Sequence, residues 1–121
     1  NLYISKNGEY LKDYFPDEQY LILSEDENYH IITGCSHAGI VNIILDFRKK
    51  FGNVKLKSIS GGFHLFRSSN RELEHVLNFL IENDIEYIIT GHCTGIDAIC
   101  HLKNRLGEKL IPIKVGLAVE V

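Results

Sequence analysis

The sequence has no methionine and no tryptophan, and only two prolines and three cysteines among its 121 residues. It has no apolar run near the roughly 20 residues that a membrane-spanning helix needs. The formal net charge of −3 gives no basic excess that would favour nucleic acid or an anionic membrane surface. With 45% hydrophobic and 24% charged residues, the composition is that of one soluble globular domain. We therefore expect neither a nucleic-acid partner nor a membrane partner.

The cysteines indicate a reducing compartment. Cys35, Cys93 and Cys100 are an odd number and include no Cys-x-x-Cys pair. This pattern predicts reduced thiols in a cytoplasmic protein and no disulfide framework. Residues 1–6 lack the basic start and apolar core of a secretory signal. The chain begins at Asn1, as a truncated, cleaved or trimmed product would.

Three short turns share one design. In residues 33–39, 61–64 and 91–95, a strand-like run ends in glycine, a histidine follows, and a helical pattern begins. Their histidines, His37, His64 and His92, are each separated by one strand-plus-helix unit. Such alternation favours a largely parallel sheet, in which ligands bind outside the carboxyl ends of the strands. The glycines would let the backbone approach a ligand closely there.

Periodicity and turn chemistry predict the remaining elements. Asn7-Gly8 favours an N-terminal hairpin turn, and Ser69 with Glu72 has the spacing of a helix capping box. Asn83 is expected to end the second helix in a left-handed conformation. The expected apolar faces include Leu45, Phe51, Ile81, Ile96 and Cys100. The expected strands cover residues 2–4, 10–15, 20–23, 29–33, 54–59, 85–90, 109–115 and 117–121, and the expected helices cover residues 40–51, 70–82 and 96–106.

The three turn histidines are candidates for a metal site. Neutral imidazole is a common ligand of zinc, iron and manganese, and metal sites often draw ligands from several loops. Each histidine alone could instead cap a strand end or bond a carbonyl group, but three in register favour a shared site of His37, His64 and His92. The same turns supply three candidate substrate-binding residues: Ser36, Gly62 and Thr94.

Two cysteines and two acidic residues have open roles. Cys93 opens a helix and could be an activated nucleophile. The phosphatase loop that this arrangement suggests would need arginine where Ile99 stands, which weakens that interpretation. Cys35 is more simply a small packing residue. Asp17 and Glu18 flank a bend, where they could support the site or merely form a polar turn.

Four blocks of sequence together resemble a known family: residues 17–19, 34–42, 61–65 and 92–95. They are similar to the branch of the metallo-β-lactamase superfamily that includes the 7,8-dihydropterin-6-methyl-4-(β-D-ribofuranosyl)aminobenzene-5′-phosphate synthases and related metal-dependent hydrolases. The resemblance implies an α/β fold of the αββα-sandwich type, a mixed sheet, and one or two metal ions, usually zinc, with manganese or iron as alternatives. It also implies hydrolysis of an ester, amide or phosphoester in a small molecule. By motif, His37 and His92 match histidine ligands, and His64 stands where the superfamily commonly has a bridging aspartate.

The chain departs from this family in one respect. The superfamily's His-x-His-x-Asp-His signature is absent, so residues 1–121 resemble a single domain equivalent to the C-terminal half of the fold. An apolar sheet face left without that other half would cost about 25 cal/mol per Å². We therefore expect a homodimer or pairing with a separately supplied N-terminal half, and little activity from this chain alone. The alternative function is a non-catalytic module that binds a metal or an anion, or serves assembly.

Overall fold

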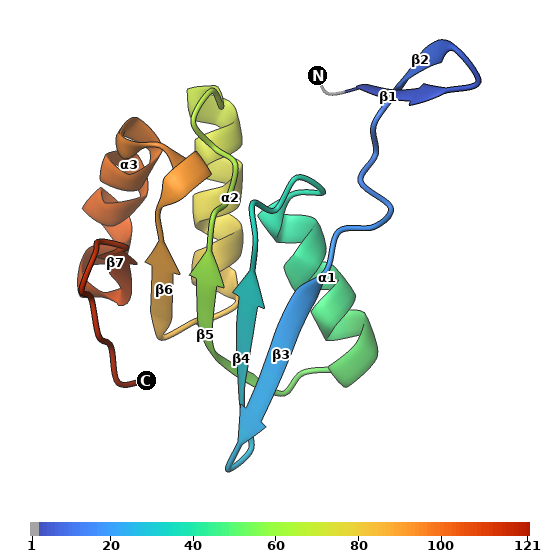
Figure 1. Cartoon of the computed structure of the whole chain (residues 1–121). Helices are drawn as coiled ribbons and strands as arrows, with labels where there is room; N and C mark the ends of the chain where they lie inside the picture. Colours follow the sequence, from blue (N-terminus) through green and yellow to red (C-terminus); the bar gives the residue numbers. More distant parts are fainter. Residues whose placement is uncertain (1–2) are drawn as a thin grey trace.

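The structure is a computed structural model that describes residues 3–121. It consists of a small N-terminal hairpin and a five-stranded sheet packed against three helices (Figure 1). The sheet has the strand order β3-β4-β5-β6-β7. None of the helices in this described part has the length and apolarity to cross a membrane. The strands are β1 (Tyr3–Lys6), β2 (Glu9–Lys12), β3 (Tyr20–Glu25), β4 (Asn28–Thr33), β5 (Lys55–Gly61), β6 (Tyr87–Thr90) and β7 (Leu110–Pro112), and the helices are α1 (Ile40–Phe51), α2 (Asn70–Glu82) and α3 (Ile96–Leu106).

The N-terminal hairpin stands apart from the sheet (Figure 1). β1 pairs with β2 in antiparallel register, from Tyr3 opposite Lys12 to Lys6 opposite Glu9. Asn7 and Gly8 have φ values of 54° and 83°, which are the left-handed conformations that a tight hairpin turn requires. The hairpin prediction is therefore confirmed, although the second strand ends at Lys12 and does not extend to residue 15 as expected. Leu2, which was expected in the first strand, lies outside the described residues.

The sheet is mixed, as expected. β3 is antiparallel to β4, whereas β4, β5, β6 and β7 are parallel. Each parallel connection carries one helix, which gives the three strand–turn–helix units that the sequence predicts. The carboxyl ends of β4, β5 and β6 consequently meet at one edge of the sheet. The three histidine turns follow these three strand ends.

The hydrophobic core lies between the sheet and the helices. Ile31, Ile59 and Ile88 are completely buried at the centres of β4, β5 and β6. Full burial of such a side chain contributes about 1.5–3 kcal/mol. The opposite face is open, because all three helices pack on one side (Figure 1). Leu21 and Ile32 on this open face remain 54% and 43% exposed.

Five helix-face predictions are wrong. Leu45 in α1 is 50% exposed, and Ile43 is buried in its place. Ile81 in α2 is 44% exposed. With 3.6 residues per turn, both positions lie well away from the centre of the buried stripe of their helix. Phe51, Ile96 and Cys100, also assigned to apolar faces, are exposed as well.

Two terminations also differ from expectation. Asn83 caps α2 in the right-handed conformation, and the positive φ falls on Asp84 at 46°. β7 ends at Pro112, short of the expected residue 115, because its partner β6 ends at Thr90, whose carbonyl still accepts from the N–H of Ile113 at 2.9 Å. Residues 117–121 do not form the expected last strand. Their Val119 and Val121 instead line a cavity over the open face of the sheet.

Candidate functional site

The first histidine turn is held by a carboxylate from outside the sheet. Glu18, in the segment before β3, accepts hydrogen bonds from the backbone N–H groups of His37 at 2.6 Å and Ala38 at 2.7 Å. Its Oε1 also lies 4.0 Å from His37 Nδ1. The Glu18 side chain is only 13% exposed, whereas Asp17 beside it is exposed. Of the two interpretations left open, Glu18 therefore supports the site, and Asp17 fits a polar turn.

The second histidine turn touches the first. The rings of His37 and His64 meet edge to face, with centroids 4.7 Å apart. Gly61 makes this approach possible, since a Cβ there would lie 2.7 Å from Thr33 Cγ2. The N–H of Gly62 then donates to the carbonyl of Gly34 at 2.8 Å. Two of the three predicted histidines are thus brought into direct contact.

The third histidine belongs to a different local group. His92 opens the short 3₁₀ helix η1 (His92–Thr94), and its side chain is exposed. Its ligand nitrogen and the sulfur atoms of Cys35 and Cys93 all lie within 4.8 Å of one another. Within residues 3–121, these three side chains are the one group of three His, Cys, Asp or Glu residues whose ligand atoms lie close enough together to share a metal ion. The metal role of His37, His64 and His92 as a set stays a prediction.

The surroundings shift the pKa of one imidazole and of one thiol toward their neutral forms. Partial desolvation and the neighbouring His37 lower the pKa of His64. Neutral imidazole, the form favoured by this shift, is the form that binds metals. Burial raises the pKa of the Cys93 thiol, and Cys35 acts in the same direction. Because the thiolate is the nucleophile, this shift argues against Cys93 as an activated nucleophile.

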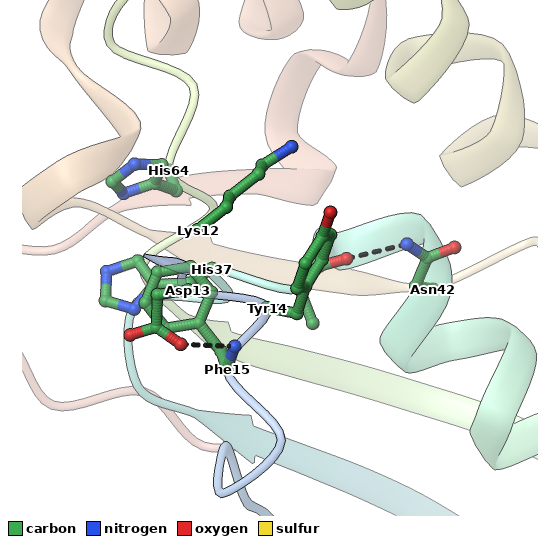
Figure 2. Close-up of a pocket in the computed structure, with 8 residues that line it drawn as sticks. Lys12, Asp13, Tyr14, Phe15, His37, Asn42 and His64 are labelled. Carbon is green, nitrogen blue, oxygen red and sulfur yellow. Dashed lines mark hydrogen bonds between the residues drawn. The ribbon is translucent and has the colours of Figure 1, made fainter. Parts of the chain in front are cut away.

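A pocket of about 520 Å³ adjoins the first two histidines. Figure 2 shows the rings of His37 and His64 at this pocket together with side chains from the segment after β2. The Phe15 ring lies 4.5 Å from the His37 ring between centroids, and the Lys12 amine lies 5.1 Å from the centroid of the Tyr14 ring. The lining residues are Lys12, Asp13, Tyr14, Phe15, His37, Ala38, Asn42 and His64.

Segment 12–15 is the part of the site that sequence reasoning missed. It has no metal-ligand spacing and no catalytic motif, and it reaches the histidines only because the chain folds back before β3. The sole local signal was the neighbouring pair Asp17 and Glu18, whose acidic character marked this bend as a possible part of the site.

The predicted substrate-binding residues occupy structural positions. Ser36 is 1% exposed, and its hydroxyl pairs with Thr33 Oγ1 at 3.2 Å. Thr94 is fully buried, and its Oγ1 accepts from the N–H of Phe63 at 2.9 Å. Gly62 is also buried. These residues join neighbouring turns and do not line the pocket beside His37, so their role toward a substrate stays a prediction.

The donors at this edge suit a zinc ion. Imidazole and thiolate are the ligands that zinc prefers, and imidazole also binds manganese and iron. The lowered pKa of His64 keeps its lone pair free near neutral pH. His37, His64 and His92 are all supplied by turns at the same edge of the sheet. The residues present therefore fit the metal that the sequence resemblance implies.

Similarity to known proteins extends over most of the chain, although no family model matches it. The chain is 35% identical over 97 residues to the 7,8-dihydropterin-6-methyl-4-(β-D-ribofuranosyl)-aminobenzene-5′-phosphate synthase of Methanocaldococcus jannaschii, a match covering 80% of this chain and 33% of that protein. An uncharacterized protein of the same organism is also 35% identical over 97 residues, covering 80% of this chain and 35% of the relative.

A solved structure matches more completely. The crystal structure of Tm1679, a metal-dependent hydrolase of the β-lactamase superfamily, is 40% identical and superimposes with a TM-score of 0.90. The match covers 98% of this chain and 46% of that chain. The chain thus spans about a third of the length of its curated relatives and less than half of the solved structure.

Proposed function

Because the chain belongs to the metallo-β-lactamase superfamily, we propose that it is the part of a metal-dependent hydrolase that supplies histidine ligands and one wall of the substrate pocket. The substrate would be a small molecule with a phosphoester or related bond. The observation that carries this proposal is the contact between the His37 and His64 rings, 4.7 Å apart beside a pocket of about 520 Å³. That volume is within the range of small-molecule sites.

The residues have distinct roles in this proposal. His37, His64 and His92 would hold one or two zinc ions, with manganese or iron as alternatives. When bound, the metal would activate water and polarise the bond to be cleaved. Glu18 keeps the His37 turn in position through its two backbone hydrogen bonds. The desolvation that lowers the pKa of His64 keeps this imidazole able to bind.

The pocket supports an anionic substrate. Lys12 is the cationic side chain among the lining residues, and its amine would attract a phosphate group. Phe15 and Tyr14 offer aromatic faces to the rest of the molecule. The Methanocaldococcus jannaschii relative is named as a synthase, so a synthase reaction is the competing activity.

The open sheet face would be covered in the working protein. Leu21, Leu23 and Ile32 are each between 43% and 54% exposed on this face. In the matching solved structure, more than half of the chain lies outside the matched region, which is enough for a second layer. We propose a complementing half of the fold as the occupant. Light scattering that shows a stable dimer of this chain would favour a second copy, and a monomer that gains no mass when the complementing half is added would contradict the proposal.

Metal analysis tests the site directly. We expect the dialysed chain to retain zinc, and His37→Ala and His92→Ala to retain less of it than the native chain. His75→Ala is the matched control, because this histidine lies exposed in α2. Equal zinc in all four proteins would contradict the histidine site.

Activity should be measured on the chain alone and after addition of the complementing half. Phosphodiesterase activity that appears on addition and disappears in His37→Ala supports a hydrolase. Stoichiometric zinc without any hydrolysis in the completed protein would favour the non-catalytic binding module instead.

A further inference from the structure

We propose that Cys35, Cys93 and His92 form a metal site with two sulfur donors and one nitrogen donor, suited to zinc. Their ligand atoms all lie within 4.8 Å of one another. The proposal goes beyond the hydrolase function, because it assigns two thiols that the histidine site does not use. It shares only His92 with that site.

The thiols meet because of the strand order. Cys35 follows β4 and Cys93 follows β6, so the end of β5 lies between them. The two cysteines are 58 residues apart in the chain, yet the thiol of Cys93 donates a hydrogen bond to the carbonyl of Cys35 at 3.4 Å. The two flanking turns must therefore come together across the middle strand.

Gly62, directly after β5, provides the space for this close approach of the two turns. A Cβ at this position would lie 2.5 Å from Cys93 Sγ and 3.5 Å from the Cα of Cys35. Gly62 is held in place by its hydrogen bond to the carbonyl of Gly34. Any side chain at residue 62 would displace the Cys93 sulfur. The absence of a side chain at Gly62 therefore leaves the space that this sulfur occupies.

The backbone conformation at His92 positions the third donor, its imidazole nitrogen. His92 has a φ of 51°, a conformation that residues other than glycine rarely adopt. His92 and Cys93 are consecutive, and their ligand atoms nevertheless lie on the same side, within reach of Cys35. Strained backbone of this kind clusters at ligand-binding sites.

The spacing matches zinc coordination after small side-chain rotations. Zinc binds sulfur at about 2.3 Å and imidazole nitrogen at about 2.0–2.1 Å, which places tetrahedral ligands roughly 3.5–3.8 Å apart. Binding would displace one proton from each thiol to the solvent, since the thiolate is the ligand. Cys35 and Cys93 are half-buried and His92 is exposed, so an ion can enter from solvent. The fourth coordination position of the ion would have no ligand from these three residues.

Cobalt titration tests the sulfur donors without relying on catalysis. The chain, kept reduced and under anaerobic conditions, is titrated with Co²⁺ while the near-ultraviolet thiolate-to-cobalt band is recorded. We expect a band in the native chain, about half its intensity in Cys35→Ser and in Cys93→Ser, and full intensity in Cys100→Ser. Cys100 is the matched control, because it is an exposed cysteine in α3. Zinc competition should show an affinity loss of about tenfold or more in the first two variants only.

Other results would overturn the proposal. These are no band in the native chain, or equal bands in Cys35→Ser and Cys100→Ser. A Cys35–Cys93 disulfide that forms with glutathione disulfide in a chain that gives no cobalt band would identify a redox pair instead. His37→Ala removes no member of this group and should keep the band. A band without hydrolysis in the completed protein would therefore overturn only the hydrolase proposal, and hydrolysis without a band only this one.

Discussion

Replacing Gly61 with alanine should push apart the first two histidine turns. Gly61 has a φ of 140°, which lies in a region open almost only to glycine. The added Cβ would lie 2.7 Å from Thr33 Cγ2 and 2.9 Å from the Thr33 carbonyl carbon. Because the second of these atoms is backbone of β4, no side-chain rotation relieves that contact. The ends of β4 and β5 would have to separate.

The expected loss in the free energy of unfolding has two contributions. The unfavourable backbone conformation costs about 1–3 kcal/mol, and overpacking costs about 1–3 kcal/mol more. The sum of roughly 2–6 kcal/mol is a large part of the ~5–15 kcal/mol that stabilises a typical domain. The melting temperature should fall by ~10 °C or more in a domain of this size.

Urea denaturation followed by circular dichroism measures this loss. Gly34→Ala is the matched control, because its Cβ would have nothing within 4 Å and its φ is not in the positive range that strains an alanine. We expect its free energy of unfolding to stay within ~0.5 kcal/mol of the native value. If the free energies of unfolding of Gly61→Ala and Gly34→Ala agree within that margin, the result would contradict the close approach of the two turns. Zinc retention should fall in Gly61→Ala and persist in Gly34→Ala.

Three further changes test other parts of the argument. Glu18→Gln removes one of the two acceptors for the backbone N–H groups of the first histidine turn, so zinc retention should fall and unfolding should become easier by ~1–3 kcal/mol, while Asp17→Asn should change neither. Ser69→Ala should cost ~1 kcal/mol at neutral pH by removing the α2 cap. The backbone N–H of Ser69, followed by its hydroxyl, lowers the pKa of Glu72 from its ordinary 4.5, so the stability that the Glu72 carboxylate adds is present above that value and is lost as the pH falls through the lowered pKa, which a denaturation series against pH would show. Leu77→Ala, at a completely buried position, should cost ~2–5 kcal/mol in the same assay, and a loss below ~1 kcal/mol would contradict the placement of the core.

Local chemistry was enough to predict most of the elements. Asn7-Gly8 gave the hairpin turn, and Ser69 with Glu72 gave the start of α2, because both depend on residues within one turn of chain. The predictions failed where a neighbour decides the outcome. Leu45 has the right character for a core position, but its side of α1 meets solvent. Residues 117–121 have strand-like composition but no place in the five-stranded sheet.

The sequence by itself determined that the three histidine turns lie at one edge, because the carboxyl ends of parallel strands meet there. Only the tertiary structure decided which groups join them. Glu18 reaches His37 across 19 residues, and the thiols of Cys35 and Cys93 approach across 58. Such contacts depend on strand order and on the room that a glycine leaves between neighbouring turns, and neither is written in the spacing of residues along the chain.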